Sequence, residues 1–480
     1  MFDDDYWATQ RVLLDTEYDI RHVNFAKFVH DHCGDSTVYV EGIGWHRWTG
    51  THWQATADEA PAMQTITDAT QILLKRAGES AGDMRWASSA ASKMLVASHR
   101  AYIVREMKFL PEFRRDVDVI DAQPHLLNFK NGTVDLRTGE LRAHRPADML
   151  TQITNVNYVP DAKCPRWDRF VEEIFPRDDD LQRYYQTFLG YCITGETRDH
   201  ALGVWYGAHG RNGKGTTVRT MQAVFGTDIV LDVPFELFEK TRGNAPHTEL
   251  IAGLRGARMV VAQEGNQGVP MDTARLKNYT GGDRISTRHL HGKQFTFQPS
   301  FTLVLATNHL PEFASGGAAL WARTKAVLFG ESFADRVDRD LEPTIQGPEA
   351  EGVAAWVVRG AVEYYRQGRL IDPLSVVAAT EMHKDEVDPL KPLLGEVFVY
   401  DERAVTPTRE FNVSLKEWRS DIGDQTNKFA PGAVKRHLLN SGSVTERRVN
   451  NRTCFVGVRL CSDPDYVADA GPGIFDRSVD

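Results

Sequence analysis

The chain has 480 residues, of which 41% are hydrophobic and 25% charged, and its formal net charge at pH 7 is −10. This length exceeds what one compact core accommodates, so we expect several domains of ordinary globular composition. The acidic balance excludes a protein that binds polyanions over its whole surface, and any contact with nucleic acid must come from a local patch or an enclosed channel.

The N-terminal residues, the lengths of the apolar runs and the spacing of the cysteines together predict a cytoplasmic protein without a membrane span. The apolar runs are shorter than the roughly 18–20 residues that cross a bilayer, and the acidic start of the chain is the reverse of the basic start of a signal peptide. The five cysteines are scattered and lack Cys-x-x-Cys spacing. This favours a reducing compartment and argues against a zinc site.

Residues 1–125 are expected to form an α+β domain. The aromatic segment 42–53 is typical of a hairpin, and its tryptophans could stack on nucleic-acid bases or form a small hydrophobic core, of which the core is favoured. Asp116 and Asp118 have the Asp-x-Asp spacing of a polymerase metal site, but the sequence around them does not resemble such a site. Residues 126–200 are expected to form a strand pair and a helical collar.

The most informative stretch is the segment 201–217. Its apolar start predicts a strand, a glycine-rich loop follows, and a helix then begins near Lys214. Strand, glycine loop and helix in this order form a phosphate cradle, in which backbone N–H groups, the helix N-terminus and the lysine face the anion. The residues that we expect to bind the nucleotide are Gly210, Asn212, Gly213, Lys214, Gly215, Thr216 and Thr217.

This segment departs from the usual pattern G-x-x-x-x-G-K-[ST] at two positions. Ala208 stands where the first glycine is usual, and Gly215 stands where a hydroxyl normally binds magnesium. Gly-Lys-Gly-Thr also occurs in adenylate kinases, so the variant is compatible with a nucleotide site in which Thr216 supplies the hydroxyl. The alternative is a glycine-rich turn with an incidental lysine.

Three further features follow in the order expected of an ATPase. A buried strand ends in Glu264, which could polarise the attacking water or bind Mg²⁺ together with Thr216, although Gln263 replaces the second acid usual at such sites. Another strand ends in Asn308, whose amide could hold the water in line with the γ-phosphate. Arg323 could act on the nucleotide of a neighbouring subunit, where such arginines raise the rate about 10³–10⁵-fold.

Between these features, residues 285–290 and 294–297 are expected to pair as a hairpin with His291 and Lys293 at its tip. A cation and an imidazole on a protruding tip are suited to gripping a phosphate backbone. The alternative is an exposed turn whose charge is merely solvated.

The C-terminal region 373–461 is locally basic, with ten Lys/Arg against five Asp/Glu between residues 408 and 460. Two short helices (412–421 and 431–439) and two strands (444–449 and 453–460) follow the pattern of a winged helix. A charged surface on a packing domain is the alternative. Residues 462–480 are rich in Pro, Gly and acidic side chains and are expected to be disordered.

The order of these motifs resembles superfamily 3 helicases, in particular the helicase half of the primase–helicases of phages, plasmids and poxviruses. The resemblance covers roughly residues 127–370. It implies an AAA+-like core, a hexameric ring and 3′-to-5′ movement on single-stranded DNA. The roles that it implies are nucleotide clamp for Lys214 and Thr216, acid for Glu264, sensor for Asn308, finger for Arg323, and DNA contact for Lys277, Arg288, His291 and Lys293.

One departure from that family is informative. Its primase–helicases often carry a polymerase-type primase domain at the N-terminus, whereas this chain reaches helicase-associated sequence after residue 125 and shows no carboxylate cluster suited to primer synthesis. We therefore expect a helicase without primase activity, which a separate primase or polymerase chain could accompany.

The sequence thus predicts an α/β protein with an AAA+-like P-loop ATPase at 201–372, an α+β N-terminal domain and a C-terminal winged helix. The expected function is an ATP- and Mg²⁺-dependent ring helicase on single-stranded or forked DNA, replicating a phage or other mobile element in the cytoplasm of a bacterial host. One alternative is a P-loop phosphotransferase, weakened by the lack of an obvious arginine-rich lid. Another is a nucleotide-dependent origin-binding or defence protein that does not unwind DNA.

Overall fold

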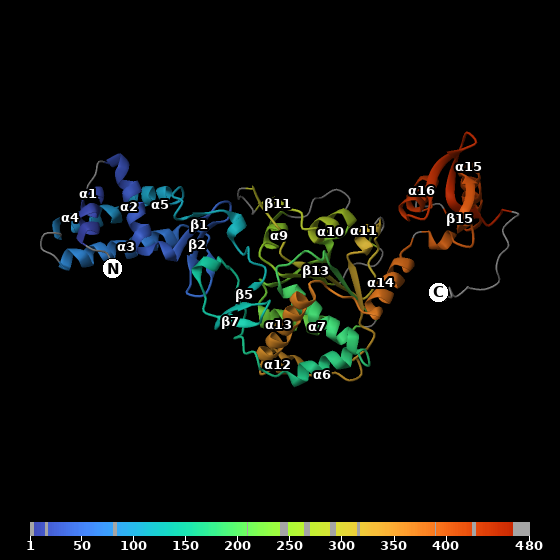
Figure 1. The fold of residues 1–480 in the computed structure, drawn as a ribbon, viewed down its shortest axis with the longest axis horizontal. Helices are drawn as coiled ribbons and strands as arrows, with labels where there is room; N and C mark the ends of the chain where they lie inside the picture. The colour runs from blue at the N-terminus through green and yellow to red at the C-terminus, as the bar shows by residue number, and fades with distance from the viewer. Residues whose placement is uncertain are drawn as a thin grey trace.

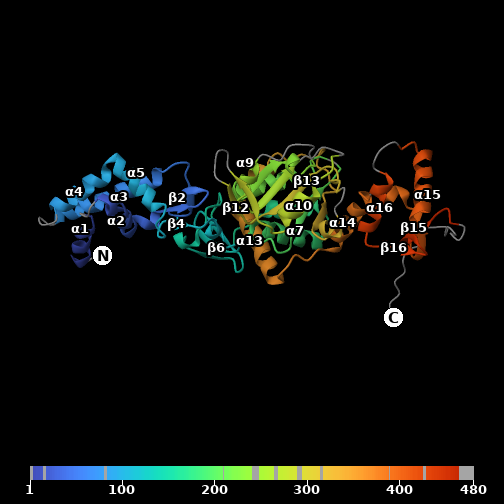
Figure 2. The same ribbon diagram turned by 90° about the horizontal axis from the view of Figure 1, so that it is seen from above.

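The computed structural model describes residues 4–14, 18–79, 84–208, 210–240, 248–263, 269–288, 294–313, 317–388, 390–424 and 429–463. Figure 1 shows three parts in a row, with N-terminal helices at one end, a central α/β part, and a C-terminal part at the other end. The view from above in Figure 2 preserves this order, so the central part separates the other two. None of the described helices is long and apolar enough to cross a membrane.

The N-terminal part combines helices with a small sheet, as the α+β prediction requires. Its helices are α1 (Asp4–Leu14), α2 (Tyr18–Cys33), α3 (Ala60–Glu79), α4 (Met84–Leu95) and α5 (Ala97–Met107). Its sheet has the order β3-β2-β1-β4 and comprises β1 (Thr37–Val40), β2 (Gly44–Trp48), β3 (Trp53–Ala55) and β4 (Arg114–Arg115). The predicted aromatic hairpin is confirmed as β2 and β3, which pair antiparallel.

The tryptophans of this hairpin pack into the protein. Trp45 and Trp53 are 3% and 2% exposed, and the Trp53 Nε1 donates a hydrogen bond to the Pro146 carbonyl at 2.8 Å. The ring of Trp48 lies 5.6 Å from that of Trp53. These rings pack against one another and into the protein core, so the interpretation as a small hydrophobic core is confirmed.

Residues 126–200 contain one strand more than the predicted pair. Strands β5 (Leu126–Phe129), β6 (Gly132–Asp135) and β7 (Glu140–Arg142) form an antiparallel sheet in that order. Two helices follow, α6 (Pro165–Ile174) and α7 (Asp179–Ile193). Helix α6 begins with a proline, whose missing N–H is harmless at the first helical position. The Glu349 carboxylate accepts hydrogen bonds from the next two backbone N–H groups, at 3.0 and 3.1 Å.

The central part is built on a five-stranded parallel sheet, counted over the described residues, in the order β14-β8-β13-β10-β9. The strands are β8 (Leu202–Tyr206), β9 (Val230–Pro234), β10 (Met259–Gln263), β13 (Thr302–Thr307) and β14 (Thr324–Leu328). Side chains on both faces of β8, β10 and β13 are buried, which explains why these strands read as continuous apolar runs. The carboxyl ends of all five strands meet at one edge of the sheet, where parallel sheets bind ligands.

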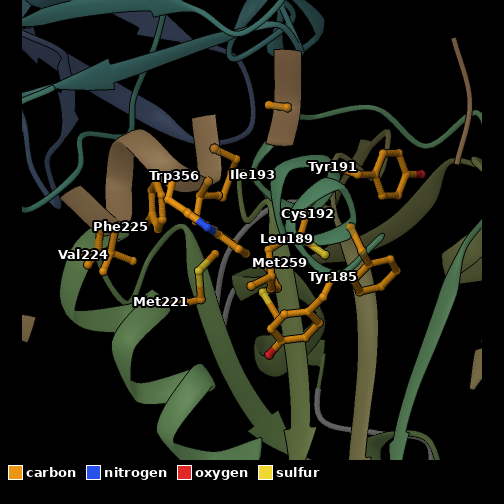
Figure 3. Packing of buried hydrophobic residues seen from close by; sticks show 14 of the residues in the cluster. Tyr185, Leu189, Tyr191, Cys192, Ile193, Met221, Val224, Phe225, Met259 and Trp356 are labelled. Atoms are coloured by element: carbon orange, nitrogen blue, oxygen red, sulfur yellow. The ribbon is translucent and has the colours of Figure 1, made fainter. Parts of the chain in front are cut away.

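One face of the sheet is covered by α7, α8 (Lys214–Phe225) and α13 (Ala350–Gln367). Figure 3 shows side chains from α7, α8, β10 and α13 converging in this core, among them Tyr185, Leu189, Met221, Met259 and Trp356. Helices α7 and α13 approach so closely at Gly190 and Gly360 that a Cβ at either position would collide with the backbone of the other helix. The strongly apolar collar predicted before the loop is therefore part of the central core.

The other face of the sheet packs against α9 (Thr248–Gly253), α10 (Thr273–Thr280), α11 (Gly317–Trp321) and a two-stranded hairpin. The hairpin strands are β11 (Ile285–Arg288) and β12 (Gln294–Phe297), which pair antiparallel with Arg288 opposite Gln294. The predicted hairpin is thus confirmed in its strands, whereas its tip, with His291 and Lys293, lies outside the described residues.

Helices α12 (Leu341–Gln346) and α14 (Leu374–Glu386) complete the central part. The C-terminal part comprises β15 (Phe398–Pro407), α15 (Thr408–Asp421), α16 (Pro431–Asn440), β16 (Thr445–Val449) and β17 (Arg452–Leu460), with sheet order β15-β17-β16. Both helices and both strands predicted here are present. Strand β15 is additional and pairs antiparallel with β17. Residues 464–480 of the predicted tail lie outside the described residues.

Candidate functional site

A glycine-rich loop connects the carboxyl end of β8 to α8, as the sequence predicts. Gly213 has a φ of 98°, a left-handed conformation that favours glycine, and a Cβ there would lie 2.6 Å from the Cγ2 of Ile174. Gly207 is equally confined, since a Cβ would lie 2.6 Å from the Nδ2 of Asn212 and would collide with the Phe329 carbonyl. The loop conformation therefore requires glycine at two of its positions.

Lys214, the first residue of α8, is buried between neutral groups. Its side chain is 7% exposed, and its Nζ donates to the Gly207 carbonyl at 3.4 Å and to the Asn308 Oδ1 at 3.3 Å. Burial lowers the pKa of Lys214 to about 8. Over the described ranges, no carboxylate forms an ion pair with this ammonium group. The site thus holds a cation that an incoming anion would stabilise.

The contact between Lys214 and Asn308 brings together two residues that the sequence proposed independently. Strand β8 pairs with β13 in parallel, so the loop after β8 and Asn308, which follows β13 directly, meet at the same edge of the sheet. Asn308 is exposed and lines the same cleft as the loop. The structure thus places Asn308 beside Lys214 and the glycine-rich loop, while its role as a sensor stays a prediction.

The two threonines of the loop face different ways. Thr216 is partly exposed and lines the cleft, and its Oγ1 donates to the Oε1 of Glu342 at 3.0 Å. Thr217 is fully buried: its Oγ1 accepts from the Tyr185 hydroxyl at 2.8 Å and donates to the Gly213 carbonyl at 3.1 Å. Successive helical residues differ in direction by about 100°, so the Thr217 side chain faces the core rather than the cleft, contrary to expectation.

The cleft beside the loop has a volume of about 910 Å³ and an excess of cations. Among the described residues, three carboxylates line it, Glu173, Asp338 and Glu342. The cationic side chains that line it are Arg166, Arg169, Arg211, Lys214, Arg219, Arg336 and Arg339. In an acidic chain, this local excess of positive charge suits a ligand with several negative charges.

Sequence reasoning did not single out the six arginines of the cleft. Four of them come from α6 and from the irregular segment between β14 and α12, and two come from the loop and α8. The sequence offered the lack of an obvious arginine-rich lid as an argument against a phosphotransferase. The arginines that line the cleft weaken that argument.

All three cleft carboxylates are bound by arginines, and the pKa values of Asp338 and Glu342 are lowered as a result. Arg166 binds the Oδ2 of Asp338 at 3.0 Å and the Oε2 of Glu173 at 3.2 Å, and the hydrogen bond from Arg166 holds the pKa of Asp338 below its usual range. Arg219 does the same for the pKa of Glu342. Both carboxylates therefore remain ionised at neutral pH.

The end of β10 reaches the same edge of the sheet. Gln263 lines the cleft, and its Nε2 donates to the Oδ2 of Asp232 of β9 at 2.8 Å. Asp232 is an exposed carboxylate that sequence reasoning did not single out. Glu264, the predicted catalytic acid, is the next residue after β10 and lies outside the described residues, so its role stays a prediction.

Arg323 lies at the opposite edge of the sheet. It directly precedes β14, whereas Lys214 follows the carboxyl end of the neighbouring strand β8. A strand of this length separates the two edges by about 16 Å. The Nη1 of Arg323 donates to the Lys277 carbonyl at 2.7 Å and to the Thr280 Oγ1 at 3.2 Å, both in α10. Arg323 therefore does not belong to the cleft of its own chain.

The predicted DNA contacts in the described residues lie on α10 and the hairpin. Lys277 is partly exposed on α10, and Arg288 is exposed at the end of β11. At the base of the hairpin, Arg284 binds the two oxygens of Asp118 at 2.8 and 3.0 Å. This ion pair connects the hairpin to the N-terminal part. It gives Asp118, one of the two carboxylates of the Asp-x-Asp pair, a structural partner.

The residues of the cleft fit a nucleotide with a divalent cation better than a structural metal. Among the described residues, no group of three or more His, Cys, Asp and Glu side chains could hold a metal ion. The cleft instead offers the Thr216 hydroxyl beside the Glu342 carboxylate, and oxygen ligands are those that Mg²⁺ prefers. Mg²⁺ usually takes few protein ligands and the phosphate oxygens of the nucleotide.

Comparison with known proteins finds one matching family model and several viral relatives of modest identity. A family model described as "D5 N terminal like" matches residues 26–176. A protein of Acanthamoeba polyphaga mimivirus, provisionally named a helicase, is 25% identical over 376 residues, which cover 73% of this chain and 38% of that protein. A provisionally named helicase of Invertebrate iridescent virus 6 is 28% identical over 46% of this chain and 24% of its own length.

A provisionally named primase of African swine fever virus is 26% identical over 45% of this chain and 23% of that protein. Among solved structures, the apo C-terminal region of NrS-1 aligns with a TM-score of 0.40 and 12% identity over 63% of this chain and 78% of that one. The chain spans between 23% and 38% of the length of the three curated relatives.

The matches support a primase–helicase family. The names printed for these relatives are those of helicases and of a primase. All three relatives are proteins of viruses of eukaryotes, so the bacterial host that the sequence led us to expect has no support.

Proposed function

We propose that this chain is an ATP-dependent DNA helicase of superfamily 3, acting in the replication of a virus or another mobile element, with an AAA+-like ATPase core at residues 201–372. The observation that carries the proposal is Lys214, a buried cation in an arginine-lined cleft, whose partners among the described residues are neutral oxygens. A buried charge without a counter-charge is costly in the folded protein, and the phosphates of a nucleotide would supply that counter-charge.

Each residue of the cleft has a definite role in this proposal. Lys214, the N–H groups of the loop and the start of α8 bind the phosphates, while Thr216 and Glu264 hold Mg²⁺. The ion would neutralise charge on the transferred phosphoryl group. Asn308 orients the attacking water, because its amide lies beside the lysine that marks the phosphate position.

The proposal requires several copies of the chain. Arg323 lies at the edge of the sheet opposite its own cleft, so it can stabilise phosphoryl transfer only in a neighbouring copy. A closed ring, for which the family resemblance implies six subunits, would place one copy's Arg323 edge against the next copy's cleft.

DNA contact is assigned to two regions. Lys277, Arg288, His291 and Lys293 would contact single-stranded DNA through α10 and the hairpin, and the family resemblance implies 3′-to-5′ movement. The C-terminal part, at residues 373–461, would act as a winged helix on forked DNA, because Arg447, Arg448 and Arg452 are exposed around the turn between β16 and β17. A separate primase or polymerase chain remains a proposed partner.

The decisive experiment measures ATP hydrolysis and strand displacement by the full chain. We expect hydrolysis to be stimulated by single-stranded DNA, and a duplex with a 3′ tail to be unwound while one with a 5′ tail is not. Lys214→Ala protein serves as the control for contaminating activity. Hydrolysis without strand displacement on either substrate would contradict the helicase and support an origin-binding or defence protein.

A P-loop phosphotransferase is the second candidate, and the arginines of the cleft are the observation that favours it. Such an enzyme would transfer the γ-phosphate to a small acceptor and would be indifferent to DNA. Formation of a phosphorylated nucleoside monophosphate from ATP, without stimulation by DNA, would select this candidate over the helicase.

A further inference from the structure

The phosphate loop carries Gly215 where a hydroxyl usually binds magnesium, and the structure places an arginine beside this glycine. A Cβ at Gly215 would approach the Nη1 of Arg219 to 2.9 Å. Arg219 lies one helical turn further along α8, so its guanidinium reaches back over the glycine. The guanidinium of Arg219 thus lies beside the position where the hydroxyl is usual.

That arginine holds a carboxylate against the loop. The Nε of Arg219 donates to the Oε2 of Glu342 at 3.0 Å and to its Oε1 at 3.2 Å, and the Nη2 also bonds to Oε1. The Thr216 Oγ1 donates to the same Oε1 at 3.0 Å. Glu342 therefore joins the arginine and the loop hydroxyl although it lies 126 residues after Thr216.

Helix α12 fixes Glu342 in this position. Glu342 lies in the first turn of α12, and the fully buried Ile345 anchors the helix in the central core. One turn further on, the Gln346 Nε2 donates to the Thr220 Oγ1 of α8 at 3.4 Å. Two successive turns of α12 thus contact α8, so the carboxylate is supported by packing and not only by its own hydrogen bonds.

The direction of the hydrogen bond matters for cation binding. A threonine hydroxyl has one proton and two lone pairs, and here the proton is donated to an ionised carboxylate. The lone pairs of Oγ1 remain for a cation, and a carboxylate behind a ligand orients it and raises its basicity. This is the arrangement that a hydroxyl needs to bind Mg²⁺.

We propose that Glu342, held by Arg219, is a positioning residue for the divalent cation that accompanies the nucleotide. It orients the Thr216 hydroxyl and so replaces the ligand that Gly215 cannot provide. The inference rests on the proposed nucleotide site and adds a role for a residue outside every motif of the loop. An exposed ion pair that only links α8 to α12 is the alternative, because the side chains of Arg219 and Glu342 are 56% and 32% exposed.

Nucleotide binding with and without the cation separates these two roles. A fluorescent ADP analogue is titrated into the full chain in excess Mg²⁺ or in EDTA. The parent protein should bind more tightly in Mg²⁺. In Glu342→Ala, that enhancement should fall about 10–100-fold, the usual effect of removing a partner behind a metal ligand, while affinity in EDTA and the melting temperature stay unchanged.

Thr216→Ala should lose the same enhancement, and the double variant should lose no more than either single one, because both residues act on one ligand. Glu363→Ala is the matched control, since Glu363 also binds an arginine, Arg366, but is not among the residues that line the cleft. It should retain the full enhancement by Mg²⁺.

Full Mg²⁺ enhancement in Glu342→Ala would overturn the inference, and so would an equal loss of affinity in both buffers, which would mean that Glu342 supports the loop rather than the cation. Equal affinity of the parent protein in both buffers would overturn it while leaving nucleotide binding intact. Absence of binding by the parent in either buffer would instead overturn the proposed function itself.

Discussion

The two edges of the central sheet differ in how deeply their key cations are buried. At the carboxyl edge, Lys214 is buried, and its partners among the described residues are neutral oxygens. At the amino edge, Arg323 is also bound to neutral oxygens, those of Lys277 and Thr280, but it is only partly buried. The first cation lies inside the cleft beside the loop, whereas the second is partly exposed.

This difference shows how one chain could divide a catalytic site between its two edges. The oxygens that Arg323 binds belong to the last turn of α10, where the helix dipole favours a cation. The γ-phosphate of a nucleotide bound to a neighbouring copy would offer Arg323 a full negative charge in place of these dipoles. Arg323 could therefore exchange the oxygens of α10 for that phosphate. Lys214 has no such freedom, because α8 and the loop enclose it.

Substitution of Arg323 tests the amino edge with the largest expected effect. Arg323→Ala should leave nucleotide affinity nearly unchanged and lower ATP turnover by about 10³-fold or more, since a finger acts on charge in the transition state. Steady-state hydrolysis, with nucleotide affinity from fluorescence titration, measures both. Arg366→Ala, at an exposed position on α13, should behave as the parent.

Mixing variants decides whether the two edges belong to different copies. Arg323→Ala protein keeps an intact cradle and Lys214→Ala protein keeps an intact finger, so mixed assemblies contain some complete sites. Partial recovery of hydrolysis on mixing is expected. If the two variants remain inactive at every mixing ratio, Arg323 does not act on a nucleotide site shared between two copies.

Substitution of Lys214 tests the carboxyl edge. Lys214→Ala should lower turnover by about 10²–10³-fold, the usual loss when one fixed electrostatic stabiliser is removed. The fold should persist, because the lysine has no ion-pair partner among the described residues. Lys130→Ala, at an exposed turn, is the control, and near-normal hydrolysis by Lys214→Ala would remove the phosphate-loop assignment.

The hairpin beside α10 tests whether the amino edge also contacts DNA. Lys293→Ala combined with His291→Ala should reduce unwinding of a 3′-tailed duplex and DNA stimulation about tenfold, since loss of phosphate contacts weakens the grip on DNA. Basal hydrolysis should persist, because the hairpin packs on the face of the sheet away from α8. Unwinding at the parent rate would move the DNA contact to Lys277 and Arg288.

The parts of the site that the sequence predicts are those set by local pattern and strand order. Strand, loop and helix follow one another in the chain, and Asn308 meets Lys214 because parallel strands share a carboxyl edge. Glu342 and Arg336 could not be found in this way. They approach the cleft from a segment more than 100 residues away, and no periodicity or motif relates that segment to the loop.

Other misses have equally local causes. The sequence favoured Thr216 as the hydroxyl of the site but also placed Thr217 there, and the hydrogen bond from Tyr185 to Thr217 directs that side chain to the core. The short strand β7 and the third strand of the C-terminal sheet, β15, were missed because neither is apolar throughout. Edge strands with mixed composition carry a weak signal on their own.

The lowered pKa of Lys214 predicts a pH dependence for the carboxyl edge. In the free protein, burial holds this pKa at about 8, so the ammonium group loses its proton as the pH rises above 8. A bound polyphosphate stabilises the charged form, and nucleotide affinity should therefore fall about tenfold between about pH 7.5 and 9.5. Lys214→Arg, which stays charged, should give a flatter profile in the same fluorescence titration, and a steep decline in that variant would contradict the assignment.

The smallest effect is expected where the amino edge meets the N-terminal part. Arg284 and Asp118 are each about half exposed, and exposed pairs contribute little to stability. Asp118→Asn should lower the free energy of unfolding only slightly in urea titrations, and 1 M salt should abolish the difference because it screens the charges. If Asp118 bound a catalytic metal instead, the variant would change divalent-ion affinity while stability stayed insensitive to salt. Restoration of stability by the exchanged pair, Asp118→Arg with Arg284→Asp, would show that the connection between the hairpin and the N-terminal part is electrostatic.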